Sequence, residues 1–345
     1  MSLDVPRARA RLLAWYDQHA RDLPWRRTRD PYAIWVSEIM LQQTRVDTVI
    51  PYYARFLARF PSATALADAP LDDVLAHWSG LGYYRRARLL HEGAKAVVRE
   101  HRGELPRAAE ARRALPGVGR YTAGAIGSIA FDLPEPIVDG NVARVLTRLL
   151  CIATALGTPS TERRLWAEAE SFAEGERPGA LNQALMELGA CVCLPQNPRC
   201  EACPLSAECA ARRTGRTHEL PIAAPKKAPR AVSLVALLAR DGQKRVFLQR
   251  AAGSLFGGMW GVPLVEGETR AEVRALAATL GIVGKLAEEP HAQVKHVLTH
   301  RVFDVRVFLM RSARAAQRDD LRAVDETAMA GLGIASLTRK LIAPR

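Results

Sequence analysis

Lysine is scarce in this chain, and a long apolar run is missing from it. Of its 345 residues, 49 are Lys or Arg, yet only seven are lysines, and none lies between Lys95 and Lys226. No apolar run is long enough to span a bilayer, and residues 1–16, rich in Arg, lack the apolar core of a signal peptide. These absences predict a cytoplasmic protein, and they leave few candidates for any mechanism that requires an amine side chain.

The charge balance is strongly basic. The formal net charge is +13, which favours a polyanionic partner such as a nucleic acid, although a solvated basic surface has the same composition. Apolar residues make up 48% of the chain and charged residues 25%, the mix of an ordinary globular protein. A chain of this length can hold two domains with separate cores.

The first two thirds of the chain have helical periodicity. Asp30-Pro31 provides the cap and the first-turn residue of a helix start. Helices are predicted over residues 32–44, 51–60, 71–78, 84–100, 107–115, 120–130 and 142–150. We predict an all-α domain over residues 1–222.

The pattern changes after residue 214. Three prolines and a Lys-Lys pair mark a linker, which we place at residues 223–231. Residues 232–238 and 245–249 are β-rich and flank Asp241-Gly242, which predicts a hairpin. With a helix expected at 269–280 and a strand at 302–310, residues 232–345 are predicted to form an α+β domain.

All six cysteines lie between Cys151 and Cys209. Four have the spacing C-x6-C-x2-C-x5-C, which predicts ligands of one metal centre: Cys193, Cys200, Cys203 and Cys209. Thiolates select zinc or an iron–sulfur cluster, and the single CxxC pair favours a cubane while leaving zinc open. Disulfides are not expected, since nothing marks the chain as secreted. Cys191 could replace Cys193, and Cys151 is expected to be a buried small apolar residue.

A glycine-rich loop, Leu115-Pro116-Gly117-Val118-Gly119, joins two predicted helices. Glycines let backbone N–H groups approach a ligand closely, and the following helix start favours an anion. A DNA phosphate suits a basic protein, although a plain helix connection has the same residues. The loop therefore predicts an anion site without proving one.

Two carboxylates could carry chemistry. Glu38 has Ile34, Trp35 and Leu41 as neighbours on one helix face, so we expect a raised pKa and a general acid near neutral pH. A buried Glu paired with an Arg is the alternative. Asp139 precedes a predicted helix, where it is either a plain N-cap or a carboxylate that stays ionised and stabilises positive charge.

Three segments together resemble the helix-hairpin-helix DNA glycosylases that carry an iron–sulfur cluster: residues 115–121, residues 138–141 and the cysteine cluster. Within that group, residues 35–44, Trp-Val-Ser-Glu-Ile-Met-Leu-Gln-Gln-Thr, are similar to the adenine DNA glycosylases, the MutY family. The resemblance extends over roughly the whole chain. It implies a [4Fe-4S] cluster, and a nucleoid-associated monomer that removes adenine mispaired with 8-oxoguanine or guanine in double-stranded DNA.

The endonuclease III family is the closest alternative. It places a catalytic lysine directly after the hairpin's Gly-Arg, where this chain has Tyr121, and Ala143 is not a lysine either. Strand cleavage through a Schiff base needs an amine nucleophile. We therefore predict a monofunctional glycosylase. A non-catalytic iron–sulfur DNA-binding or redox-sensing protein is the second alternative, against which the two carboxylates argue.

The resemblance also implies roles for individual residues. Glu38 protonates the base, Asp139 stabilises the sugar cation, and Tyr121 and Asn141 orient the carboxylates and water. The adenine pocket is matched by Trp25, Arg26, Leu41, Val46, Gln183 and Met186, of which Trp25, Leu41, Val46 and Met186 could equally be core. Contacts to DNA and to the opposite base are matched by Gln43, Thr44, Leu81 and Tyr83, with Leu115, Gly117, Val118 and Gly119 in the hairpin.

Residues 256–263, Phe-Gly-Gly-Met-Trp-Gly-Val-Pro, resemble the Nudix-like module of the same family. A Nudix hydrolase needs a run of Glu on one helix to hold metal ions, but residues 270–278 keep only Glu272. We therefore predict recognition without hydrolysis. The family's Phe-Ser-His loop is here Leu298-Thr299-His300, and Thr299 and His300 are expected to contact the DNA.

Overall fold

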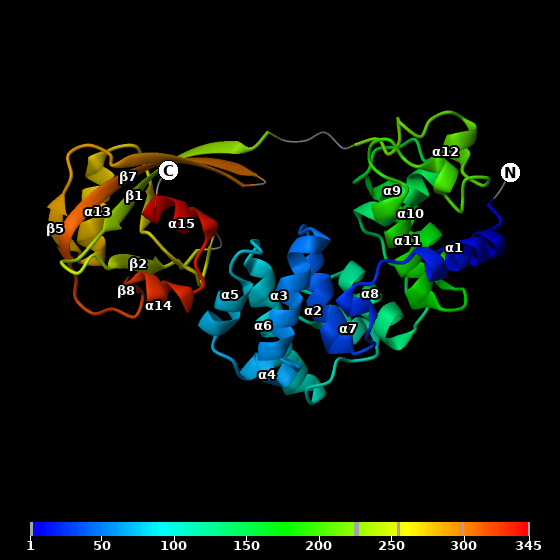
Figure 1. Cartoon of the computed structure of the whole chain (residues 1–345), viewed down its shortest axis with the longest axis horizontal. Helices are drawn as coiled ribbons and strands as arrows, with labels where there is room; N and C mark the ends of the chain where they lie inside the picture. The colour runs from blue at the N-terminus through cyan, green and yellow to red at the C-terminus, as the bar shows by residue number, and fades with distance from the viewer. Residues whose placement is uncertain (1–2, 224–227, 254–255, 299, 344–345) are drawn as a thin grey trace. The chain divides into compact units, whose positions relative to one another are not determined.

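The computed structural model describes residues 3–223, 228–253, 256–298 and 300–343 (Figure 1). Contacts divide the chain into two compact units. Unit 1 comprises Met1–Ala67 and Glu92–Pro225, and unit 2 comprises Asp68–His91 and Lys226–Arg345. Unit 2 therefore combines a short helical segment with the C-terminal third of the chain.

Unit 1 is helical. Its α-helices are α1 (Val5–His19), α2 (Pro31–Leu41), α3 (Val46–Arg59), α4 (Ala63–Asp68), the end of α6 (Arg85–His101), α7 (Ala109–Ala114), α8 (Arg120–Phe131), α9 (Gly140–Leu149), α10 (Pro159–Ala173), α11 (Pro178–Cys191) and α12 (Ala210–Arg213). Apolar faces of α1, α9, α10 and α11 share one core, in which Leu12, Leu146, Leu165 and Leu185 are fully buried. This packing fixes α9 against α11, which is the arrangement on which the site below depends.

Helix α2 begins where the sequence predicts and ends earlier. The Asp30 carboxylate accepts hydrogen bonds from the backbone N–H groups of Tyr32 and Ala33, and Pro31 occupies the first turn. The helix stops at Leu41 because Gln43 has a φ of 57°, in the left-handed region. The predicted extension to residue 44 is therefore wrong, and Gln43 and Thr44 lie in a turn.

The glycine-rich loop joins α7 to α8 as predicted. Gly117 has a φ of 78°, which a residue with a side chain rarely adopts. Gly119 is the N-cap of α8 and offers no side chain to the first turn, so the N–H groups there lack a side-chain cap. The first turn of α8 is therefore open to an external acceptor.

Unit 2 contains two sheets. Its strands are β1 (Arg230–Ala239), β2 (Val246–Arg250), β3 (Trp260–Gly261), β4 (Leu264–Glu266), β5 (Val283–Leu286), β6 (Ala292–Val297), β7 (Arg301–Arg314) and β8 (Leu321–Val324). One sheet has the order β4-β1-β7-β5, with β6 also paired to β7, and the other has the order β3-β2-β8. Its helices are α5 (Leu71–Trp78), the start of α6, α13 (Arg270–Leu280), α14 (Glu326–Ala330) and α15 (Ser336–Ile342).

Alternate residues of β1 face two different cores. Val235 and Leu237 pack with α13, whereas Leu234 and Ala236 pack with Trp260 and α15. The larger sheet is thus covered on both faces, and the predicted order of an all-α region followed by an α+β region is confirmed.

The predicted hairpin around Asp241-Gly242 is confirmed at the turn but not along the two strands. The turn exists, since the Asp241 carboxylate accepts hydrogen bonds from the N–H groups of Gln243 and Arg245. However, β1 is already paired with β4 and, in parallel, with β7, and it meets β2 only at the bridge between Arg240 and Val246. The chain reverses direction at this turn, and β1 and β2 then belong to different sheets.

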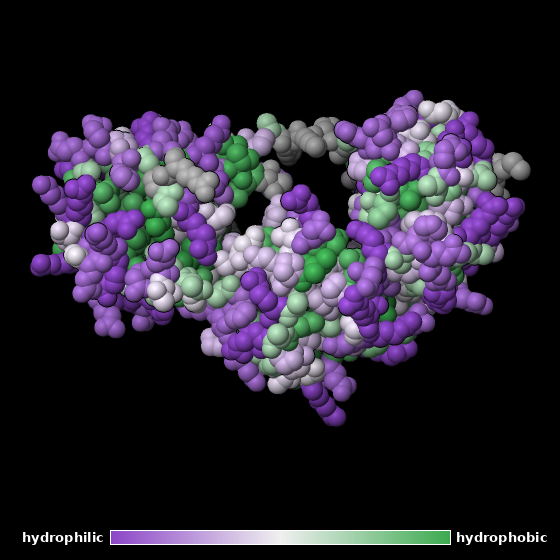
Figure 2. Space-filling view, viewed as in Figure 1, coloured by the Kyte–Doolittle hydropathy of each residue, from purple (hydrophilic) through white to green (hydrophobic). Residues whose placement is uncertain are grey.

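Hydrophilic side chains predominate on the face of the molecule shown in Figure 2, in keeping with a chain in which 25% of the residues are charged. Within the described residues, no helix is both long enough and apolar enough to cross a membrane.

Candidate active site

A cavity of about 700 Å³ opens in unit 1. Its walls come from α2 and the turn after it, from the α7–α8 loop, from the start of α9 and from α11. The cavity is lined by all four predicted catalytic residues, Glu38, Tyr121, Asp139 and Asn141, and by all six predicted pocket residues, Trp25, Arg26, Leu41, Val46, Gln183 and Met186. Side chains that are up to 161 residues apart in sequence therefore share one cavity.

Glu38 is buried at the wall of this cavity, with 4% of its surface exposed. The Tyr121 hydroxyl donates a hydrogen bond of 2.7 Å to its Oε2 atom. Burial raises the pKa of Glu38 to about 7; the Tyr121 hydrogen bond opposes the rise and the nearby Asp139 carboxylate adds to it. The expected raised pKa is confirmed, and Glu38 can hold a proton near neutral pH.

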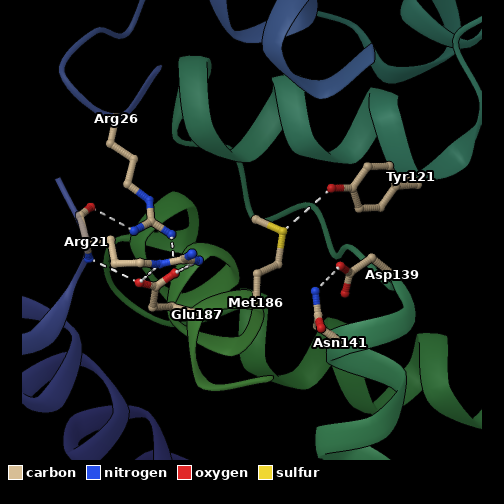
Figure 3. Close-up of polar contacts among 7 residues, drawn as sticks. All are labelled: Arg21, Arg26, Tyr121, Asp139, Asn141, Met186 and Glu187. Carbon is tan, nitrogen blue, oxygen red and sulfur yellow. Dashed lines mark hydrogen bonds and ion pairs between the residues drawn. The ribbon is translucent and has the colours of Figure 1, made fainter. Parts of the chain in front are cut away.

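Asp139 is the N-cap of α9. Its Oδ1 atom accepts a 2.7 Å hydrogen bond from the Val142 N–H, and its Oδ2 atom accepts a 3.0 Å bond from the Asn141 amide (Figure 3). Burial nevertheless raises the pKa of Asp139, because it outweighs these hydrogen bonds. Both pKa values therefore rise, and the carboxyls differ in how many donors they receive, since Asp139 accepts from a backbone N–H and an amide and Glu38 accepts from one hydroxyl.

An arginine connects the site to the cysteine loop. Arg144 donates to the Asn141 Oδ1 atom at 2.8 Å, which fixes the orientation of that amide, and to the Cys193 carbonyl at 2.7 Å. One turn further along α9, Arg148 lies 3.3 Å from the Cys193 sulfur and donates to the Leu194 carbonyl at 2.6 Å. Helix α9 thus holds two of the catalytic candidates, Asp139 and Asn141, at its start and contacts the cysteine loop through Arg144 and Arg148.

The four predicted ligand cysteines line one cavity, and Cys191 does not. Burial raises the pKa of the Cys203 thiol to about 12, and Cys193, Cys209 and Cys200 add to the rise. Among the described residues, however, no three His, Cys, Asp or Glu side chains are grouped so that they could hold a single metal ion. Cys151 is only partly buried, which contradicts its expected core position, because its φ of 49° turns it toward Thr214 and Arg216.

Models of two known families match the chain. The model described as HhH-GPD superfamily base excision DNA repair protein matches residues 36–171, and the model of the NUDIX domain matches residues 235–344. A solved structure of a thermostable thymine-DNA glycosylase is 31% identical, with a TM-score of 0.55; the match covers 61% of this chain and 97% of that one. The chain belongs to the HhH-GPD superfamily.

Curated relatives identify more specifically which members of the HhH-GPD superfamily the chain resembles. The adenine DNA glycosylase of Rattus norvegicus is 50% identical over 230 residues, which is 63% of this chain and 45% of the relative. That of Arabidopsis thaliana is 37% identical over 336 residues, which is 86% of this chain and 53% of the relative. The chain spans about half the length of these relatives, and the resemblance to the adenine DNA glycosylase family is confirmed.

One ion-pair network at this cavity was not predicted from the sequence. Glu187, only 1% of whose side chain is exposed, accepts hydrogen bonds from Arg21 at 2.8 Å and from Arg26 at 2.8 Å (Figure 3). Burial raises the pKa of Glu187, but the two arginines outweigh it and lower the pKa to about 2. A usable signal was present, because Glu187 stands four residues after Gln183 on α11 and so shares its face.

The predicted DNA-contact residues fall into separate groups. Gln43, Thr44, Gly117 and Gly119 line the cavity of unit 1, whereas the Leu115 and Val118 side chains are buried. In unit 2, Leu81 is buried and 47% of Tyr83 is exposed, both in the turn between α5 and α6. His300 is exposed in the turn between β6 and β7, and Thr299 lies outside the described residues.

Proposed function

We propose that this chain is a monofunctional DNA glycosylase that removes adenine from double-stranded DNA, where the adenine is mispaired with 8-oxoguanine or guanine. The observation that carries the proposal is the pair Glu38 and Asp139 in one cavity, with Tyr121 bonded to Glu38. The names of the curated relatives support adenine as the base, and the family resemblance supports the mispairs.

Glu38 is the proton donor in this proposal. A flipped adenine entering the cavity meets a carboxyl whose pKa is raised to about 7, so a protonated form of Glu38 is available at neutral pH. Proton transfer to a ring nitrogen lets the base leave with the electrons of the N-glycosidic bond. The Tyr121 hydroxyl, which donates to Oε2, leaves Oε1 as the atom available for that proton.

Asp139 faces the positive charge that then develops on the sugar. Its carboxylate is fixed by the Val142 N–H and the Asn141 amide, so it does not reorganise as the charge appears. Water adds to the sugar carbon and leaves an abasic site. Since no lysine lies between Lys95 and Lys226, the domain has no amine there to form a Schiff base and cut the strand.

Selection of adenine is assigned to α11. Gln183 offers an amide that can both donate to and accept from a base edge. The ionised Glu187 accepts four hydrogen bonds from Arg21 and Arg26, so its role in this proposal is to hold Arg26 at the cavity wall and not to contact the base. Trp25, Leu41, Val46 and Met186 complete an apolar wall around these polar groups.

Cys193, Cys200, Cys203 and Cys209 would hold a [4Fe-4S] cluster. Four thiols that line one cavity suit a cubane, in which each thiolate binds a different iron. The bound cluster would supply a rigid cross-link of the loop that follows α11. Purified protein is expected to contain iron and sulfide in equal amounts, which Cys203→Ser removes and Cys151→Ser does not. Stoichiometric zinc would overturn this assignment.

The α7–α8 loop and the open first turn of α8 are proposed to hold a DNA phosphate, and the protein is proposed to act as a monomer at the nucleoid.

The deciding experiment uses duplexes with adenine opposite 8-oxoguanine, adenine opposite guanine, and an oxidised pyrimidine. Half of each sample is treated with alkali. We expect breaks at adenine only after alkali. Breaks without alkali, trapped by borohydride, would support a lyase, and binding without base release would support a non-catalytic protein.

A further inference from the structure

Unit 2 contains a close interface between its helical segment and its Nudix-like fold. The Asp72 Oδ2 atom lies 2.5 Å from an Arg250 guanidinium nitrogen, and Arg88 donates a hydrogen bond to the Gly257 carbonyl. The two members of the ion pair are 25% and 34% exposed, so the pair is partly shielded from water. These contacts join α5 and α6 to the strands through fixed polar groups.

Glycines bring the two surfaces into backbone contact. A Cβ atom added to Gly333 would lie 2.5 Å from the Leu75 Cβ, which is closer than two carbons approach. A Cβ atom added to Gly258 would lie 3.7 Å from the Arg88 Cδ, 3.7 Å from a Leu71 methyl carbon and 3.8 Å from a Leu75 methyl carbon. The Gly333 carbonyl also accepts from the Trp260 N–H at 2.9 Å, so the segment that touches α5 is anchored in the smaller sheet.

The interface continues into the turn that carries Tyr83. The Gly80 N–H donates to the Tyr84 hydroxyl at 3.4 Å, and that hydroxyl donates to the Ile334 carbonyl at 3.3 Å. Ser79 donates to the same carbonyl at 3.2 Å. The turn between α5 and α6 is therefore hydrogen-bonded at its base to the segment next to β3.

The turn itself is shaped to present Tyr83. This residue has a φ of 47°, unusual for a residue with a side chain, and 47% of its surface is exposed. The Arg86 guanidinium lies 5.4 Å from its ring centroid. An exposed aromatic ring held in a constrained turn can stack on a nucleobase, provided that its support does not move.

We propose that the Nudix-like fold is the support of this turn, and that Tyr84, Asp72, Arg250 and Gly333 are positioning residues for discrimination of the base opposite the adenine. The proposal rests on the proposed function and adds a mechanism to it. The Nudix-like fold influences specificity through α5 and α6, in addition to any direct contact that it makes with DNA.

The main test compares two glycines in the full-length chain. Gly333→Ala forces the surfaces apart, whereas Gly331→Ala is the matched control, because its Cβ would meet only the Ala328 carbonyl at 3.8 Å. Single-turnover rates are measured for adenine opposite 8-oxoguanine and opposite guanine. We expect Gly333→Ala to lower the ratio of these rates about three- to tenfold, and Gly331→Ala to leave it unchanged.

Amide exchange without DNA provides a second readout. The N–H groups of Leu81 and Arg86 are bonded to the Trp78 and Tyr83 carbonyls, and both should exchange faster in Gly333→Ala and in Tyr84→Phe. Because this readout needs no substrate, it separates failure of the positioning proposal from failure of the proposed function. Wild-type exchange and a wild-type rate ratio in Gly333→Ala would overturn the positioning proposal.

The ion pair offers a test by rescue. Asp72→Arg is expected to lower the rate ratio about two- to fivefold, and adding Arg250→Glu to restore it. Arg250 also lies over the Trp260 ring, and Arg322→Ala controls for that contact because Arg322 stacks on the same ring at 4.6 Å. A double variant no better than Asp72→Arg would show that the pair does not couple the two surfaces.

Discussion

Helices α9 and α13 each have an acidic side chain at or near the helix start, but the surroundings of the two carboxylates differ. In α9, the cap Asp139 is partly buried, is hydrogen-bonded by its own helix, and lines the same cavity as Glu38. In α13, Glu272 forms a capping box with Thr269 at an exposed helix start, and its hydrogen bonds lower its pKa. The surroundings of a carboxylate at a helix start therefore decide whether its pKa rises or falls.

The same comparison explains why unit 2 is not expected to hydrolyse nucleotides. Glu272 is the carboxylate of α13, and the Thr269 side chain and backbone N–H are bonded to its Oε2 atom. A metal-dependent hydrolase needs several carboxylates that are available to cations. Here the single acid of the helix stabilises the helix start instead.

The largest effect is predicted for substitution of the two carboxyls at the cavity, Glu38 and Asp139. Glu38→Gln removes the proton donor, and Asp139→Asn removes the charge that faces the sugar. Each is expected to reduce single-turnover adenine release by about 10²- to 10⁴-fold, the typical contribution of a positioned acid or base, while DNA binding persists. A near wild-type rate in either variant would exclude that residue from catalysis. Glu272→Gln, the exposed counterpart, is expected to retain full activity.

A second prediction concerns stability. The pKa of Glu38 rises from 4.5 to about 7 on folding, so its contribution is present below pH 4.5 and is lost as the pH rises through 7. The free energy of unfolding of the wild type, relative to Glu38→Gln, should therefore fall by about 2 kcal/mol between pH 5 and pH 8. Chemical denaturation at several pH values measures this. Equal pH dependence in the two proteins would show that Glu38 is not perturbed.

The pH dependence of the reaction provides a smaller but more direct test. If Glu38 acts in its protonated form, the single-turnover rate should fall about tenfold for each pH unit above 7. The rate is measured with saturating enzyme, so that binding does not contribute. A rate that stays constant from pH 7 to pH 9 would contradict general-acid catalysis by Glu38.

The smallest predicted effect concerns the exposed helix start. Thr269→Ala removes the α13 cap and should destabilise unit 2 by about 1 kcal/mol. Thermal unfolding of the full-length chain measures the loss, and adenine release should be unchanged. Hydrolysis of nucleoside triphosphates by the wild type in the presence of Mg²⁺ would contradict the structural role assigned to Glu272.

Local sequence signals predicted the parts of the site that depend on one helix. Glu38 could be assigned a raised pKa because its apolar neighbours are three and four residues away on α2, and Asp139 could be placed at a helix start. The four cysteines were predictable because their spacing confines them to one loop.

Interactions between distant segments could not be predicted in this way. Arg21 and Glu187 are separated by 166 positions, and nothing local to either residue specifies the other. The separation of β1 and β2 into different sheets was missed for the same reason, because β4, further along the chain, takes the edge of β1 that a hairpin would use, and β7 takes the other edge. The net shift of Asp139 depends on how deeply the tertiary structure buries it.

Helix α6 has a consequence for how this protein can be shortened. Its first residues belong to unit 2 and its last residues to unit 1, so the chain passes between the units at residues 67/68, 91/92 and 225/226. A fragment that stops at residue 222 keeps α5 and the Tyr83 turn but loses Gly258, Gly333 and Ile334, which cover them. Such a truncation uncovers Leu71 and Leu75 as well as deleting a domain. Poor solubility or altered specificity of the fragment would therefore reflect the exposure of Leu71 and Leu75 as well as the loss of the domain. Point substitutions in the intact chain separate these two effects.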